Sequence, residues 1–141
     1  MQRWWVVRAA ALAASLAVTL GCSGSILLDV TSVPAGTWGG DHATLVVGAS
    51  ASTVQFDCAH GTLDSPIRLD RNARFDVSGV FVREHGGPIQ VGANEDRHTA
   101  RFFGSFDGGR LTLFISVADL DLQLGPFALV MGGTSHLVRC L

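Results

Sequence analysis

Apolar and polar residues alternate along most of the chain beyond residue 42, as they do in strands that bury one face. The clearest run places Leu111, Leu113, Ile115 and Val117 on one face. Turn residues such as Asp107-Gly108-Gly109 separate the runs, and hardly any segment shows a helical period. The pattern predicts strands at 43–47, 52–59, 67–69, 75–81, 100–106, 111–117, 120–129 with a break at Gly125-Pro126, and 136–141.

Short strands at intervals of about ten residues are typical of antiparallel barrels and sandwiches. Sequential hairpins need no crossover connections, and closure removes both sheet edges. We therefore expect an all-β domain, a small up-and-down β-barrel of about eight strands, with a β-sandwich as the alternative.

The first residues have the composition of an export signal. Arg3 and Arg8 precede an apolar run, Ala9 to Leu20, which is short for a membrane span. The ending Thr19-Leu20-Gly21-Cys22 resembles a bacterial lipobox, in which the cysteine is lipidated. We expect a signal peptide at 1–21, a lipidated tether at 22–35 and the barrel domain at 36–141. The alternative is a secreted protein that is cleaved after Ser25.

The cysteines fit an oxidising compartment. If Cys22 carries lipid, Cys58 and Cys140 remain as one disulfide pair. A disulfide between them closes a loop of about 82 residues, which stabilises a fold by roughly 4 to 5 kcal/mol in the chain-entropy model. Cys58 alternates with Val54 and Phe56, so we expect it on the core face of the strand. The alternative role of Cys58 is a catalytic thiol.

Charge restricts the partners of the exported chain. Without Arg3 and Arg8, eight arginines and no lysines stand against twelve acids. This balance argues against nucleic acid and against electrostatic binding to an anionic membrane surface. We expect a cell-envelope protein that is anchored through Cys22, on the periplasmic face of the outer membrane in a Gram-negative organism.

Three motifs carry resemblances to other proteins. Gly36-Thr37-Trp38 resembles the Gly-X-Trp that begins the first strand of lipocalins and related calycin barrels, which implies that Arg139 covers Trp38. The segments GTWGGDH, FDCAHG and REHGGP resemble those of small uncharacterised exported bacterial proteins. The second resemblance covers nearly all of the exported chain and implies no known activity.

Four histidines, His42, His60, His85 and His98, lie beside acids at the expected strand ends. Alternate strand ends of an antiparallel barrel meet at one rim, where these imidazoles and carboxylates could hold a metal such as zinc. Their spacing matches no metal motif, so a role as hydrogen-bond partners of loops is the alternative. The sequence implies no cofactor.

The long connection from Glu84 to Arg97 has the length of a lid or binding loop. A binding role for a small apolar ligand or an envelope partner is the main hypothesis, with Trp38 near the floor of the barrel. Its candidate ligand-binding residues are Trp38, His42, His60, Glu84, His85 and Arg101.

Two other functions stay open. A metal-binding or hydrolytic enzyme would use Asp57 with His60, or Glu84 and His85 with Arg101, as acid and base. A protease-inhibitor-like interaction protein would present an exposed apolar patch, for which Phe103 and Phe114 are candidates.

Overall fold

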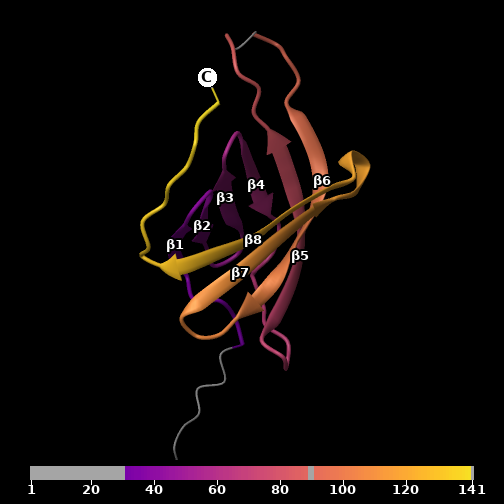
Figure 1. Ribbon diagram of the computed structural model, residues 1–141. Coiled ribbons are helices and arrows are strands. Elements are labelled where there is room, and N and C mark those ends of the chain that lie inside the picture. Colours follow the sequence, from indigo (N-terminus) through magenta and orange to yellow (C-terminus); the bar gives the residue numbers. More distant parts are fainter. Residues whose placement is uncertain (1–30, 89–90, 141) are drawn as a thin grey trace, which may run out of the picture.

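The computed structural model describes residues 31–88 and 91–140. Eight antiparallel strands, each bonded to the next, close into a barrel through pairing of the last strand with the first (Figure 1). The predicted up-and-down barrel is confirmed. The predicted signal peptide and Cys22 lie outside the described residues. The strands are β1 Gly36–Gly40, β2 Ala43–Val47, β3 Ser52–Phe56, β4 Ala59–Leu63, β5 Arg74–Arg83, β6 Asp96–Phe106, β7 Arg110–Val117 and β8 Leu122–Met131.

The barrel interior is filled by its own side chains. Inward residues of all eight strands form one apolar core, in which Trp38 and Phe102 are the largest fully buried side chains. A Cβ atom added at Gly61 would lie 2.9 Å from the Phe102 ring, and one at Gly79 would lie 3.0 Å from it. These glycines therefore make room for an aromatic ring in a closely packed barrel centre.

The strand predicted at 52–59 is confirmed as β3 from Ser52 to Phe56, but its predicted end is wrong because the chain turns at Asp57-Cys58 and continues as β4. Cys58 has a φ of +56° and lies in this turn, so it does not share the core face of Val54 and Phe56. The sequence hides β4 because small residues, Ala59 and Gly61, occupy inward positions and give a weak apolar signal.

The predicted break in the alternation at Gly125-Pro126 is confirmed, although the strand itself continues. β8 runs through this dipeptide, and its pairing with β7 shifts register between Leu113 and Ile115. The irregularity is a local bulge that a continuous strand can absorb. A 3-10 turn, η1 Ala118–Leu120, joins β7 to β8.

Residues 132–140, which we call the C-terminal arm, lie along β1 at the seam of the barrel, the place where β1 and β8 pair to close it. β1 pairs with β8 only at Trp38↔Met131 and Gly39↔Val130. Beyond these pairs, the His42 N–H donates to the His136 carbonyl at 3.0 Å. The predicted strand 136–141 is therefore wrong, since the described arm makes one parallel bridge, Asp41↔His136.

Residues 31–34 are hydrogen-bonded to the connection between β4 and β5. The Val33 N–H donates to the Ile67 carbonyl and the Leu69 N–H to the Thr31 carbonyl, at 3.0 and 2.9 Å. Val33 is buried in the core. Residues 67–69, predicted as a strand, instead form a connection with one bridge, Ser32↔Arg68.

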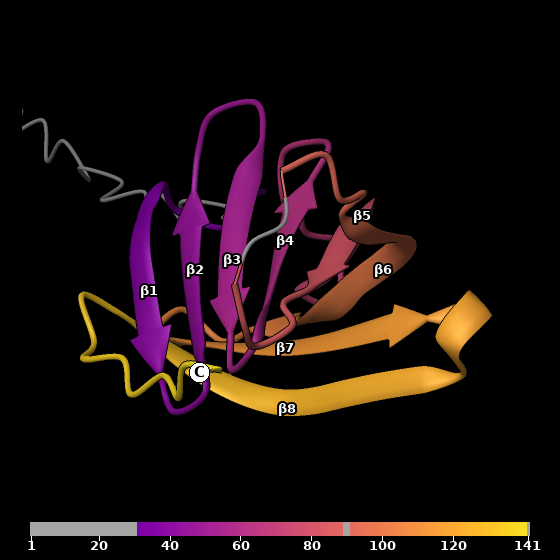
Figure 2. The same cartoon turned by 90° about the horizontal axis from the view of Figure 1, so that it is seen from above.

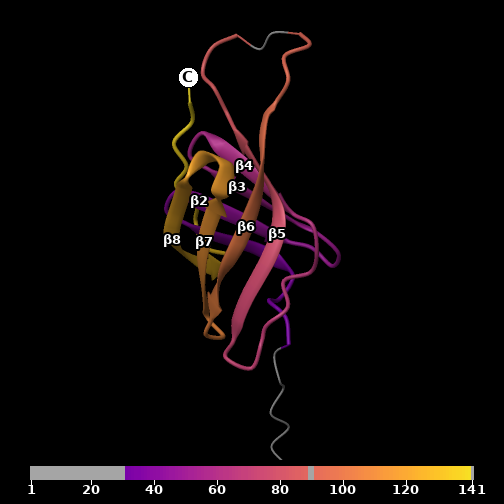
Figure 3. The same cartoon turned by 90° about the vertical axis from the view of Figure 1, so that its right-hand side faces the viewer.

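Up-and-down connectivity gives the barrel two different ends. The turns β1–β2 and β3–β4, the connection 84–95 between β5 and β6, and η1 all follow odd-numbered strands, so they lie at one end, which we call the histidine rim. Residues 31–34 enter at the opposite end, as Figures 1 and 3 show. In the part of the chain that is described, no helix is long and apolar enough to cross a membrane.

Candidate functional site: the histidine rim and the barrel mouth

All five histidines lie at the histidine rim, and each bonds to a carboxylate there. Asp96 and His98 lie two residues apart on β6, whereas neighbouring turns and strand ends supply the partners of the other pairs, which is why those acids are more distant in sequence. The pairs are His42–Asp57 at 2.5 Å, His60–Glu84 at 2.8 Å, His85–Asp96 at 2.7 Å, His98–Asp96 at 2.7 Å, His98–Asp119 at 2.6 Å and His136–Asp41 at 2.9 Å.

His98 lies at the centre of a small network. Its Nδ1 bonds to Asp119 and its Nε2 to Asp96, whose other oxygen bonds to His85. Both ring nitrogens of His98 must donate, so the geometry favours its charged form. The hydrogen bonds that His98 donates to Asp119 and Asp96 raise the pKa of His98, and the hydrogen bonds that Asp96 accepts from His85 and His98 lower the pKa of Asp96.

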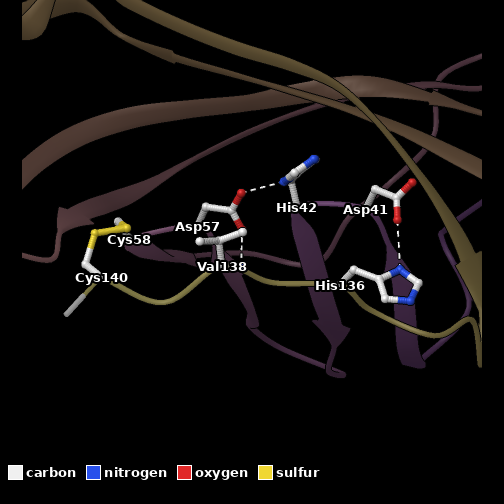
Figure 4. Close-up of polar contacts among 7 residues, drawn as sticks. All are labelled: Asp41, His42, Asp57, Cys58, His136, Val138 and Cys140. Carbon is white, nitrogen blue, oxygen red and sulfur yellow. Dashed lines mark hydrogen bonds and ion pairs between the residues drawn. A yellow bond between two sulfur atoms is a disulfide. The ribbon is translucent and has the colours of Figure 1, made fainter.

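Asp57 fastens the C-terminal arm to the rim, as Figure 4 shows. Its Oδ1 accepts the Val138 N–H at 2.6 Å and its Oδ2 accepts from His42. The hydrogen bond from the Val138 backbone is the main reason that the pKa of Asp57 is lowered, and His42 contributes further. Next to it, Cys58 and Cys140 form the predicted disulfide, with their Cα atoms 5.1 Å apart.

A pocket of about 370 Å³ opens at the mouth of the barrel on this rim. We call it the mouth pocket. Phe81, Leu122 and Leu124 supply apolar lining, and Leu122 and Leu124 are only half-buried. Its polar lining includes Asp57, Arg83, Glu84 and His85.

The sequence-predicted binding residues do not gather at one place. Glu84 and His85 line the mouth pocket, and His60 bonds to Glu84 from the start of β4. His42 lies nearby in the β1–β2 turn, beside a second pocket that includes Pro126 and Phe127.

Trp38 and Arg101 lie elsewhere. The Trp38 indole N–H donates to the Pro34 carbonyl at 3.1 Å, and its ring packs edge-on against Phe106 near the end of the barrel where residues 31–34 enter. Arg101 bonds to Asp76 on the outer face of β5 and β6. Arg139, which the calycin resemblance places over Trp38, instead lies beside Cys58 and Glu84 at the histidine rim.

The five imidazoles meet carboxylates rather than one another. Among the described residues, no group of three or more His, Cys, Asp or Glu side chains is arranged to hold a metal ion. His98 in addition offers no nitrogen lone pair while both its nitrogens donate.

Phe103 and Phe114 lie on the outer face of the barrel, in the outward phase predicted for them. Their rings stack at 5.5 Å with an interplanar angle of 13°. They line a groove of about 750 Å³, the outer groove, together with Leu69, Arg74 and Asp76. Both rings are half-buried.

Sequence reasoning missed Arg83, which lines the mouth pocket. The signal was present, because Arg83 continues the inward series Phe75, Val77, Gly79 and Phe81 by one step. Arg83 occupies a position where the alternation calls for an inward, apolar residue, and a long connection follows it. An arginine in such a position indicates the end of the strand where the core reaches solvent.

No family model, curated protein or solved structure matches the chain.

Proposed function

We propose that the protein is a non-catalytic binding protein that takes a small apolar or amphipathic ligand into the mouth pocket. The observation that carries the proposal is the lining of Phe81, Leu122 and Leu124, which combines apolar surface with charged groups of the histidine rim. Pockets that combine apolar lining with a few polar groups are typical of small-molecule sites.

The packed interior determines where such a ligand lies. Phe102 fills the barrel centre against Gly61 and Gly79, so an internal ligand would have to displace core side chains. The mouth pocket needs no such displacement, and its volume lies within the range common for ligand sites, about 300 to 1,000 Å³.

The proposal includes export and anchoring through a lipidated Cys22. Residues 31–34 enter the barrel opposite the histidine rim, so a tether from Cys22 would join the barrel at the end that does not carry the mouth pocket. Radiolabelled palmitate tests the anchor. The wild type is expected to incorporate label and Cys22→Ala is not, and label in both would contradict it.

Hydrolysis at the rim has less support than binding. The acid and base suggested by the sequence, Asp57 and His60, are engaged by His42 and Glu84 respectively. A protease-inhibitor-like role would use the outer groove, whose stacked Phe103 and Phe114 rings offer an apolar surface.

Binding of the neutral dye Nile red, followed by its fluorescence, tests the proposed site. Replacing Leu122 and Leu124 together by Gln is expected to weaken binding at least fivefold, because the pocket loses apolar surface. The control, Val130→Gln, changes an outer-face residue that is 45% exposed. Equal binding by both variants and the wild type would overturn the proposal.

A further inference from the structure

We propose that Arg83 gives the mouth pocket a preference for amphipathic ligands with an oxyanion head group, such as a carboxylate on an aliphatic chain. This inference rests on the proposed binding function and adds the chemical class of the ligand. It is carried by the position of Arg83 and by the way the neighbouring acids are already bonded.

Arg83 ends β5 at the point where the inward face of the strand reaches solvent. It follows Phe81 by two residues, and both side chains line the mouth pocket. Its neighbours across the sheet are Ala59 on β4 and Asp96 on β6. The guanidinium is therefore placed at the edge of an apolar surface.

The expected cross-strand partner of Arg83 is Asp96, but histidines occupy that carboxylate. Asp96 Oδ2 bonds to His85 and Asp96 Oδ1 to His98, at 2.7 Å each. Among the described residues, Arg83 has no carboxylate within 4.0 Å.

The other acids that line the mouth pocket, Asp57 and Glu84, also bond to partners other than Arg83, Asp57 through both oxygens and Glu84 through one. Asp57 uses one oxygen for the Val138 N–H and the other for His42. Glu84 bonds to His60. The local acids thus bond to histidines and not to Arg83. The planar guanidinium of Arg83 is therefore available to donate two hydrogen bonds to an oxyanion.

Charge at the pocket makes the preference depend on pH. The titratable groups that line the pocket with Arg83 are Asp57, Glu84 and His85, and Asp96 lies across from it on β6. His98 bonds to Asp96, and the hydrogen bonds that it donates to Asp119 and Asp96 raise its pKa. When His98 loses its proton, the negative charge of Asp96 is no longer balanced, so binding of an anion beside Arg83 is expected to weaken as pH rises through the raised pKa of His98.

Calorimetric titration with decanoate, decanol and decyltrimethylammonium at pH 6.5 tests this inference. All three carry the same chain, so differences between them report on the head group. We expect decanoate to bind at least tenfold more tightly than decanol, and the cationic amphiphile to bind most weakly.

Arg83→Gln is expected to weaken decanoate binding about tenfold and to leave decanol within twofold of the wild type. Arg83→Lys is expected to retain part of the preference, because it keeps the charge but loses the two-point geometry. Arg110→Gln, which removes an exposed arginine at the start of β7 at the opposite end of the barrel, is the control and should bind all three probes as the wild type does.

The outcomes separate this inference from the function on which it rests. If none of the three amphiphiles binds, the proposed function itself fails. If decanoate and decanol bind equally, or if Arg83→Gln lowers both affinities alike, the mouth pocket binds apolar chains but the role of Arg83 is overturned.

Discussion

At the scale of single residues, the main feature of the histidine rim is its set of hydrogen-bonded histidine–carboxylate pairs. Each imidazole meets a carboxylate, and the one with two such partners, His98, keeps only 14% of its side-chain surface exposed. Two carboxylates that accept hydrogen bonds from one imidazole stabilise its charged form and so raise its pKa. These contacts couple the stability of the barrel to pH.

The free energy of unfolding is predicted to be greatest between about pH 4 and 6.5. The pKa of His98 is raised in the folded state, so its contribution is complete below the unfolded value near 6.5 and is lost as pH rises through the folded value. The pKa values of Asp57 and Asp96 are lowered, so their contributions are present above about 3.8 and are lost as pH falls through the folded values.

Urea unfolding from pH 6 to 9 checks this prediction. His98→Gln is expected to flatten the decline in stability over this range. The control, His136→Gln, removes a pair whose side chains are 73% and 78% exposed and should keep the decline that is linked to His98. An unchanged decline in His98→Gln would contradict the assignment.

Gly39 is a second residue whose identity is set by its contacts. A Cβ atom at this position would lie 2.0 Å from the Gly133 carbonyl oxygen, where β1 meets the C-terminal arm. Gly39→Ala is expected to lower the free energy of unfolding by about 1 to 3 kcal/mol, the usual cost of overpacking. Gly109→Ala is the matched control, because its nearest contact would be at 3.9 Å. Equal stability of the two variants in urea would argue against a tight seam.

The C-terminal arm is the element that the sequence described least well. Alternation predicted a last strand, yet the arm is held by the Cys58–Cys140 disulfide, by Asp57 and by one bridge at His136. The number of cysteines predicted that Cys58 pairs with Cys140. The sequence did not predict that Cys58 lies in a turn, because a two-residue turn does not interrupt the alternation of apolar and polar residues on either side of it.

Strands with bulky inward residues were predictable, and those with small ones were not. β5, β6 and β7 follow from their Phe, Val and Leu alternation, whereas β4 was missed because Ala59 and Gly61 face inward. The sequence also placed histidines at strand ends on one rim. Asp96, beside His98 in the sequence, does bond to it, but the sequence could not indicate the other partners because they are more distant along the chain.

Loss of the disulfide is predicted to weaken the whole barrel. The two cysteines are separated by 82 residues, and Cys140→Ser is expected to lower the free energy of unfolding by roughly 3 to 5 kcal/mol. Urea unfolding of the oxidised wild type and the variant measures the difference. A change below about 1 kcal/mol would mean that the remaining contacts hold the arm without the covalent bond.

The described residues form a filled barrel with two chemically different ends. In the view of Figure 2, strands β1 to β4 run across β7 and β8. One end receives residues 31–34 and the other carries the histidine rim. Because the interior is occupied, the ligand that we propose would bind on the outside, at the mouth pocket, with the outer groove as the alternative place.

The measurement that decides between these two places is a methyl and aromatic NMR titration of the whole described domain with decanoate. We expect the largest shifts at Phe81, Leu122 and Leu124, and we expect them to saturate together. Shifts confined to Phe103 and Phe114 in the outer groove, or no saturable shift at all, would contradict binding at the mouth pocket.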